Sequence, residues 1–387
     1  MRKYKCCLLL TAGLILTSCS NTAKSEYKTE SIHQKATLNM LTANSESIYS
    51  NTYANLKITE DFTLLIPNAS EMKRFLLKQG DYVSADELQK IFHSSLTQYF
   101  SDLYSESELE SLANEAEQTD TMIFLENSDM GLTLIQPGYV HAYNRGAAMA
   151  IDPSPMPANI YFPAAAHDIL QIYDMDALYS EDTWMLTDGN LSVIDAVKLA
   201  ETLLATSSEL KPLIRNLNVV SLTDTINVYC MAVTLQYGGI PFDIADISPS
   251  AVSFESVSLA SENEQKSYVN LPGTIVISDN QNIDFQIGIC TDYTIEVQET
   301  AFECITPESA IQIASEYLTE GVMFEADKME LIYAPYTISS ANEPIRQQVD
   351  PVWKIRLFNS NDNMYYALYI DALNGECNCY KYTKESE

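Results

Sequence analysis

The hydrophobic and polar positions of residues 57–190 follow one helical and several strand-like patterns. Apolar residues recur at helical spacing behind residues 84–87, a Ser-Ala-Asp-Glu capping box: Leu88, Ile91, Phe92, Leu96 and Phe100. Strand-like runs occupy residues 62–67, 121–125, 131–136 and 139–143. These patterns predict an N-terminal domain of mixed α+β structure over residues 57–190.

The helical pattern returns as an internal repeat, because residues 191–200 and 305–314 align without a gap. Ser192 and Thr306 match as N-cap residues, and Pro307 stands at the first helical position, where its missing N–H costs nothing. Apolar pairs then stay in register: Ala196/Ala310, Val197/Ile311, Ala200/Ala314, Leu203/Tyr317 and Leu204/Leu318. Each segment is predicted to form a helix that packs one face on a sheet.

Strand-like runs follow each of these two predicted helices. They are residues 217–222, 226–237, 273–278, 283–289, 329–336, 351–358 and 364–370. Gly238-Gly239 is typical of a hairpin or bulge turn. We expect two modules of one helix plus an antiparallel sheet, over residues 191–300 and 301–387, so that the whole chain has an α+β fold. The sheet face away from each helix is expected to meet water or a partner.

The first eighteen residues have the three parts of an export signal, with Arg2, Lys3 and Lys5 ahead of an apolar run too short to span a bilayer. Leu16-Thr17-Ser18-Cys19 then reads as a lipobox. We therefore predict a lipoprotein signal peptide over residues 1–18, lipidation of Cys19, and a flexible polar tether over residues 19–56. The protein is expected at the extracytoplasmic face of the cell membrane, held by its lipid anchor only. A plain secretory peptide is the alternative.

The net charge limits the partners that we expect, and the cysteine pattern limits the expected metal-binding and disulfide chemistry. A formal charge of −31 repels polyanions, so no nucleic acid partner is expected, and solubility is favoured as the reason for the acidity. Five cysteines remain beyond the signal and Cys19: Cys230, Cys290, Cys304, Cys377 and Cys379. Buried free thiols are slightly favoured over one or two disulfides, and no zinc-ligand spacing is present.

No catalytic or metal-binding constellation stands out in the sequence. The histidines, His33, His93, His141 and His167, accompany neither a G-x-S-x-G elbow nor an H-E-x-x-H helix. An acidic cluster lacks EF-hand spacing, so a solvated loop is favoured over a calcium site: Asp174, Asp176, Glu181, Asp182 and Asp188. We expect no enzyme, no cofactor, no metal, and no catalytic or cofactor-binding residue.

Three stretches of the second half resemble PepSY-like modules, the helix-plus-sheet units of peptidase propeptides and many extracytoplasmic lipoproteins. They are residues 306–310 at the second helix, residues 351–355 on a strand, and Tyr369-Ile370-Asp371-Ala372-Leu373-Asn374-Gly375-Glu376, similar to a D-A-x-T-G-E turn. The tandem arrangement resembles membrane-anchored regulators of a cell-wall-sensing kinase, and the whole chain resembles a clostridial lipoprotein family of unknown function. Trp353 is expected in the core beneath the helix.

These patterns lead to one main functional expectation and two alternatives. The main one is a non-catalytic lipoprotein that binds or regulates another envelope protein. The first alternative is a lipoprotein that captures a solute or ligand for transport or sensing, in a deep cleft lined by aromatic residues. The second is a hydrolase with paired carboxylates in residues 57–190. The sequence names no partner, ligand or oligomeric state.

Overall fold

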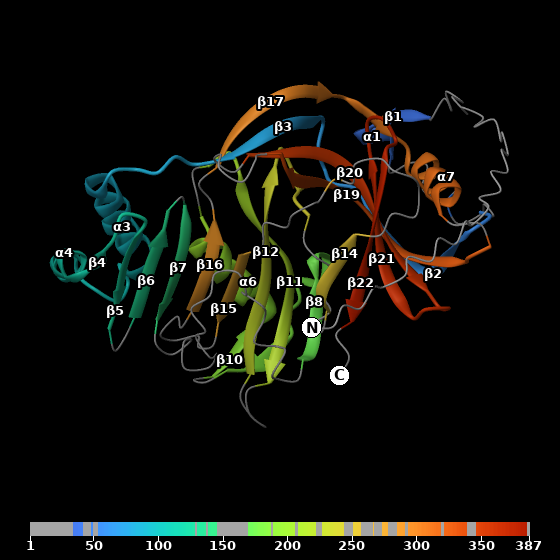
Figure 1. The fold of residues 1–387 in the computed structure, drawn as a ribbon. Helices are drawn as coiled ribbons and strands as arrows, with labels where there is room; N and C mark the ends of the chain where they lie inside the picture. The colour runs from blue at the N-terminus through green and yellow to red at the C-terminus, as the bar shows by residue number, and fades with distance from the viewer. Residues whose placement is uncertain are drawn as a thin grey trace, which may run out of the picture. The chain divides into compact units, whose positions relative to one another are not determined.

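The computed structural model describes residues 34–41, 48, 53–127, 130–136, 138–144, 169–186, 189–205, 208–221, 227–243, 251–256, 266, 273–277, 285–290, 293–318, 321–338 and 346–384. The chain divides into two units, residues 1–32 and 33–387, and the described residues all lie in the second. Figure 1 shows two large sheets and several helices in this unit, which confirms the predicted α+β class.

The first large sheet has ten strands. They are β4 (Glu117–Gln118), β5 (Met122–Glu126), β6 (Met130–Ile135), β7 (Tyr139–Asn144), β8 (Ile169–Asp174), β11 (Lys211–Ser221), β12 (Asn227–Tyr237), β13 (Ile240–Pro241), β15 (Gly273–Ile277) and β16 (Phe285–Cys290). Their order is β4-β5-β6-β7-β16-β15-β12-β11-β8, with β13 paired to β12. Gly238-Gly239 forms the predicted turn, because Tyr237 pairs with Ile240 across it and both glycines have positive φ.

The helix α3 (Ala85–Phe100) begins at Ser84, whose side chain accepts a hydrogen bond from the Glu87 N–H. The predicted start is therefore confirmed. The apolar face of α3 is buried at Leu88, Phe92, Leu96 and Phe100, while Ile91 is 42% exposed. Beside it lies α4 (Glu106–Glu115), and both helices contact β5.

The second large sheet has eight strands. They are β2 (Leu56–Leu65), β3 (Met72–Gln79), β14 (Ala251–Ser256), β17 (Tyr293–Ala301), β19 (Phe324–Thr337), β20 (Arg346–Asn359), β21 (Met364–Asp371) and β22 (Cys377–Lys384). The main order is β14-β22-β21-β20-β19-β2, with β3 paired to both β17 and β20. The run β19 to β22 is the predicted antiparallel meander, whereas β2 joins β19 in parallel.

Both helices of the internal repeat are confirmed as α6 (Val193–Leu203) and α7 (Pro307–Tyr317). The Ser192 side chain accepts from the Asp195 N–H, and the Thr306 side chain accepts from the Ser309 N–H. The buried face of α6 contacts β11 and β15, and α7 contacts β21. Trp353 is fully buried, as expected, and its Nε1 donates to the Ile305 carbonyl at 2.9 Å.

The predicted tether over residues 19–56 needs correction where the structure describes it. The strand β1 (Lys35–Thr37) pairs with β18 (Glu303–Ile305), just ahead of α7. The short helix α1 (Leu38–Leu41) then buries both of its leucines. Asn55 Nδ2 donates to two carbonyls at the end of α7, those of Ser315 and Leu318. Leu38 and Leu41 therefore belong to the folded unit, and we restrict the proposed tether to residues 19–33.

The strand pairings also cut across the expected domain boundaries at residues 190 and 300. From the expected N-terminal domain, β2 and β3 join the eight-stranded sheet, while β7 pairs with β16 of the expected first module. From that module, β14 and β17 pair with β22 and β3. The helix-plus-meander pattern is present twice, but each sheet is completed by distant strands because edge strands find partners irrespective of sequence separation.

Shorter elements and one aromatic cluster connect these parts. The 3-10 helix η2 (Met175–Ala177) follows β8, and β9 (Thr183–Met185) pairs with β10 (Asn190–Ser192) ahead of α6. Phe75 of β3 lies with its ring centroid 5.1 Å from Tyr237 of β12 and 5.1 Å from Tyr333 of β19. All three rings are buried, so apolar contacts join the two large sheets.

Candidate functional site

Charged residues on β20 lie on the sheet face opposite Trp353. Side chains alternate along a strand, so Asp350 and Lys354 share this second face, and each is 1% exposed. Glu330 and Tyr369 lie beside Lys354 on the neighbouring strands β19 and β21. The expectation that the second face meets water or a partner is therefore wrong at these positions, which are buried inside the chain.

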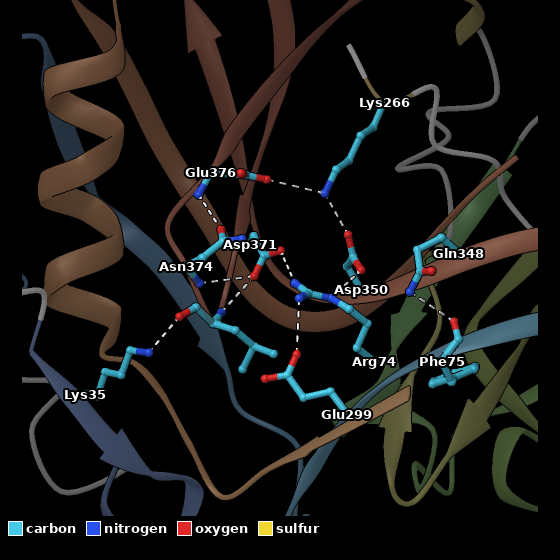
Figure 2. Close-up of polar contacts among 11 residues, drawn as sticks. Lys35, Arg74, Phe75, Lys266, Glu299, Gln348, Asp350, Asp371, Asn374 and Glu376 are labelled. Atoms are coloured by element: carbon cyan, nitrogen blue, oxygen red, sulfur yellow. Dashed lines mark hydrogen bonds and ion pairs between the residues drawn. The ribbon is translucent and has the colours of Figure 1, made fainter. Parts of the chain in front are cut away.

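Arg74 of β3 is the centre of one network on this face, and Figure 2 shows its three acidic partners. Arg74 Nε donates to Asp350 Oδ1 at 2.8 Å, Nη2 donates to Asp371 Oδ2 at 2.5 Å, and Nη1 donates to Glu299 at 3.2 Å. Lys266 Nζ donates to the other Asp350 oxygen at 2.7 Å. Burial raises the pKa of Asp371, while the Leu373 N–H and the Arg74 charge act in the opposite direction.

Asp371 has a second role, because it opens the Asp-Ala-Leu-Asn-Gly-Glu turn. Its Oδ1 accepts hydrogen bonds from the N–H groups of Leu373 and Asn374, at 2.9 and 3.3 Å. Gly375 follows with a φ of 83°, which suits glycine. The motif therefore has a local structural reason: a short carboxylate shapes the turn and also anchors Arg74 (Figure 2).

Asp243, Lys354 and Tyr369 form a second network, in which both carboxylate oxygens of Asp243 accept hydrogen bonds. Lys354 Nζ donates to Asp243 Oδ1 at 2.8 Å, and the Tyr369 hydroxyl donates to Oδ2 at 2.7 Å. Burial raises the pKa of Asp243, and the Lys354 ammonium opposes that shift. Every carboxylate oxygen of Asp243, Asp350 and Asp371 has a donor, so these networks hold strands together and offer no open coordination.

Arg215 of β11 differs from these groups because its hydrogen bonding is incomplete. Its Nη2 pairs with Glu330, whose other oxygen lies 3.5 Å from Lys328 Nζ. The side chains of Arg215 and Glu330 are 5% and 4% exposed. Among the residues that the structure describes, no acceptor lies within hydrogen-bond distance of the buried Arg215 Nη1. An unsatisfied donor on a buried charged group costs more than about 1–3 kcal/mol, so it invites a functional explanation.

Arg215 also lines a cavity of about 530 Å³, here named the Arg215 cavity, between strands of the two large sheets. Its apolar lining includes Leu64, Leu65, Ile66, Met175, Leu213 and Leu331, and its polar lining is Asn68, Arg215, Gln236 and Glu330. The volume falls in the range of small-molecule sites, roughly 300–1,000 Å³, and apolar walls with a few polar groups are typical of them. Among the described residues, no aromatic side chain belongs to this lining, whereas the sequence led us to expect an aromatic cleft.

The residues singled out from the sequence lie away from this cavity or outside the described ranges. Cys19, His33, His167 and Asp188 lie outside the described ranges, as do residues 1–18 of the predicted signal peptide. His93 is on α3 and His141 is on β7. Asp182 accepts a hydrogen bond from the Tyr173 hydroxyl, so part of the acidic cluster serves packing. Within the described ranges, no set of three histidine, cysteine or acidic side chains is placed to hold a metal ion, and no helix could cross a membrane.

Four of the five remaining cysteines have described side chains, namely Cys230, Cys304, Cys377 and Cys379, and these four are free thiols. Cys230, Cys304 and Cys379 are buried, and burial raises the pKa of each to about 12. Cys377 is partly exposed and its pKa is likewise raised to about 12 by burial. Thiols with such pKa values are poor nucleophiles near neutral pH, so the geometry gives them a packing role.

Sequence reasoning missed Arg74, Arg215, Glu330 and Lys354, which carry the buried charges. A signal was present for Lys354, which stands between Trp353 and Ile355 in a strand-like run. A single charge in such a run is almost never buried without a partner. The partners come from positions more than a hundred residues away, such as Glu330 for Arg215.

Comparisons with known proteins give a fold neighbour and no function. No protein-family model and no curated protein matches the chain. Among solved structures, the chain is similar to an uncharacterized protein from Eubacterium rectale, with a TM-score of 0.50 and 17% sequence identity. The match covers 87% of this chain and 92% of that one. At this identity the likeness concerns the fold alone, and the resemblance to PepSY-like modules stays a prediction.

Proposed function

We propose that the chain is a lipid-anchored extracytoplasmic binding protein that captures a small ligand in the Arg215 cavity and catalyses no reaction. The observation that carries the proposal is a cavity of about 530 Å³ whose wall contains a buried guanidinium with an unused donor. Pockets of this size, mostly apolar with a few fixed polar groups, are the usual sites of small ligands. The lipobox supports the anchor, since acyl chains on Cys19 would keep the site beside the membrane.

A thermal-unfolding screen tests the capture of ligands, with a cavity-filling variant as its control. Ligands that bind only the folded state raise Tm, and the increase grows with the logarithm of the ratio of ligand concentration to Kd. Leu213 is a half-buried lining residue, so Leu213→Trp would fill space that a ligand needs. We expect compounds that raise the Tm of the wild-type protein to leave that of the variant unchanged. A library of amphipathic compounds that shifts neither protein would contradict the proposal.

The lipid anchor is tested separately by changing the lipidated residue. Cys19→Ser removes the thiol that would receive the acyl chains. We expect the wild-type protein to sediment with membranes and to incorporate labelled palmitate, whereas the variant does neither. Equal membrane association of the two proteins would contradict an anchor at Cys19.

Binding of an envelope protein, the main expectation from the sequence, is the second candidate and has one specific observation in its favour. The edge strand β8 exposes Leu170 and Ile172 by 47% and 49%. Among the described strands, β8 pairs only with β11. Exposed edges accept an added strand from a partner peptide. A photo-crosslinking residue at position 172 should capture a membrane protein in cells, while one at exposed position 102 on the surface after α3 should not.

A further inference from the structure

Lys354 and Asp243 form an ion pair in which both side chains are buried. Each side chain is 1% exposed, and Lys354 Nζ lies 2.8 Å from Asp243 Oδ1. The backbone of Asp243 is fixed, because its N–H donates to the Tyr333 carbonyl at 2.8 Å. Lys354 is fixed by the pairing of β20 with β19 and β21. An amine and a carboxyl group are therefore held in contact as long as the chain is folded.

The surroundings of this pair are apolar. Ile332, Val352 and Ala367 share the sheet face of Lys354 and belong to one buried cluster. Charged groups are unfavourable in such surroundings. Transfer of one proton from Nζ to Oδ1, across the hydrogen bond between them, gives a neutral amine beside a neutral carboxylic acid. An uncharged amine is a nucleophile, and an uncharged acid accepts its attack more readily than a carboxylate does.

Glu330 and Tyr369 favour the same chemistry from the two neighbouring strands. Burial raises the pKa of Asp243, the Lys354 ammonium opposes this, and the Glu330 charge acts with burial. Glu330 lies directly opposite Lys354 on β19. The Tyr369 hydroxyl donates to Asp243 Oδ2 at 2.7 Å. When an amine attacks a carboxyl carbon, negative charge develops on the oxygen that stays, and a donor already placed at this oxygen stabilises it.

We propose that Lys354 and Asp243 become joined by an intramolecular amide bond, which the folded chain forms once and without a cofactor. Nζ attacks Asp243 Cγ, which is one bond away from the oxygen that Nζ already contacts. The Nζ–Cγ bond forms and the Cγ–Oδ1 bond breaks. The Oδ1 hydroxyl leaves with a second Nζ proton as one water molecule, so nothing is oxidised or reduced. Oδ2 becomes the amide oxygen and keeps its hydrogen bond from Tyr369.

The bond would add a covalent link between positions 111 residues apart. It would tie β20 to the segment after β13, beside the buried face of the eight-stranded sheet. Neither Lys354 nor Asp243 lines the Arg215 cavity, so the proposal does not depend on the capture of a ligand. A cross-link of this kind suits a protein that works outside the cytoplasm, because it needs no redox partner.

Lys266 and Asp350 provide a control within the same chain. Lys266 Nζ lies 2.7 Å from Asp350 Oδ2, but the lysine side chain is 20% exposed. Asp350 also pairs with the Arg74 guanidinium, which stays charged. A carboxylate beside a permanent cation resists attack by an amine. We expect no amide bond between Lys266 and Asp350, although the distance between them is as short.

Tryptic digestion of the denatured full chain, followed by mass spectrometry, tests the bond. Trypsin cleaves after lysine only where the side chain is unmodified, so an amide at Lys354 blocks cleavage there. We expect residues 216–266 and 347–356 to appear as one species, with the mass of the two peptides less one water. Cleavage after Lys266 should proceed, as the control requires. Recovery of the two peptides only as separate species, with cleavage after Lys354, overturns the proposal.

The variant Lys354→Arg assigns the bond to its amine. Arginine keeps the positive charge beside Asp243, but its guanidinium does not lose a proton in proteins and is no nucleophile. Cleavage after position 354 should return and the joined species should disappear. A second variant, Asp243→Asn with Lys354→Met, removes both charges together, so no buried charge is left unpaired. A joined species of the two segments that persists in either variant overturns the proposal, because other side chains would then form it.

Discussion

Arg74 and Asp371 form an ion pair at 2.5 Å although they lie 297 positions apart in the sequence. Arg74 extends from β3, near the beginning of the described chain, and Asp371 ends β21, near its close. The pair joins strands that the chain must bring together from opposite ends. It also explains why Asp371 is needed in a turn that Asn could otherwise shape.

Loss of the Arg74 charge should destabilise the protein strongly. Arg74→Met would leave two buried carboxylates, Asp350 and Asp371, without the guanidinium that lies between them. Removing one partner of a buried ion pair typically costs about 3–5 kcal/mol. Lys57→Met is the matched control, since the pair of Lys57 with Glu325 is exposed to solvent and should contribute little to stability. Urea denaturation measures both, and equal losses of stability would contradict the structural role of Arg74.

His141 should make stability depend on pH above the range in which carboxylates titrate. Burial lowers the pKa of His141 from its ordinary value of 6.5, and the charge of Glu126 acts in the opposite direction. The folded state therefore binds the proton less tightly than the unfolded state does. The resulting stability is present above about pH 6.5 and is lost as the pH falls below it.

The measurement compares urea midpoints at pH 7.5 and pH 6.0. The wild-type midpoint should fall on acidification, and the fall should be smaller in His141→Gln. An identical pH response in the two proteins would show that His141 is not the titrating group.

Gly239 should tolerate substitution less well than its neighbour Gly238. Both have positive φ, of 86° and 57°, so an alanine at either costs about 1 kcal/mol in backbone strain. A Cβ at Gly239 would in addition lie 2.9 Å from the Asn68 carbonyl oxygen, whereas one at Gly238 would meet nothing within 4 Å. Gly239 and Asn68 both line the Arg215 cavity.

We therefore expect Gly239→Ala to lose at least about 1 kcal/mol more stability than Gly238→Ala and to show smaller ligand-induced increases in Tm. Thermal unfolding and calorimetry of the two variants provide the comparison. Equal ligand-induced increases in Tm in both variants would argue against the turn as part of the ligand site.

Local features of the fold were predictable from the sequence because they depend on neighbouring residues. Ser84, Ser192 and Thr306 begin helices where their side chains reach the first N–H groups. Gly238 and Gly239 form a two-residue turn because both can adopt positive φ. The apolar alternation of β19 to β22 likewise predicted a meander of successive hairpins.

Long-range pairings and buried charges could not be predicted in this way. Nothing in the sequence of β2 favours β19 over another edge strand, and its parallel alignment is set by tertiary contacts. Residues 34–56 look polar, yet Leu38 and Leu41 are buried against the rest of the fold. The pairing of Lys354 with Asp243 could not be predicted from neighbouring residues, because Asp243 is 111 positions away.

Native mass spectrometry of the full chain, extracted gently from membranes, tests the ligand cavity most directly. The wild-type protein should carry a bound small molecule with a mass of a few hundred daltons, released on unfolding. The Leu213→Trp variant, with the cavity filled, should have the mass of the acylated chain alone. An identical spectrum for the two proteins, with no bound molecule in the wild type, would contradict the capture of a ligand in the Arg215 cavity.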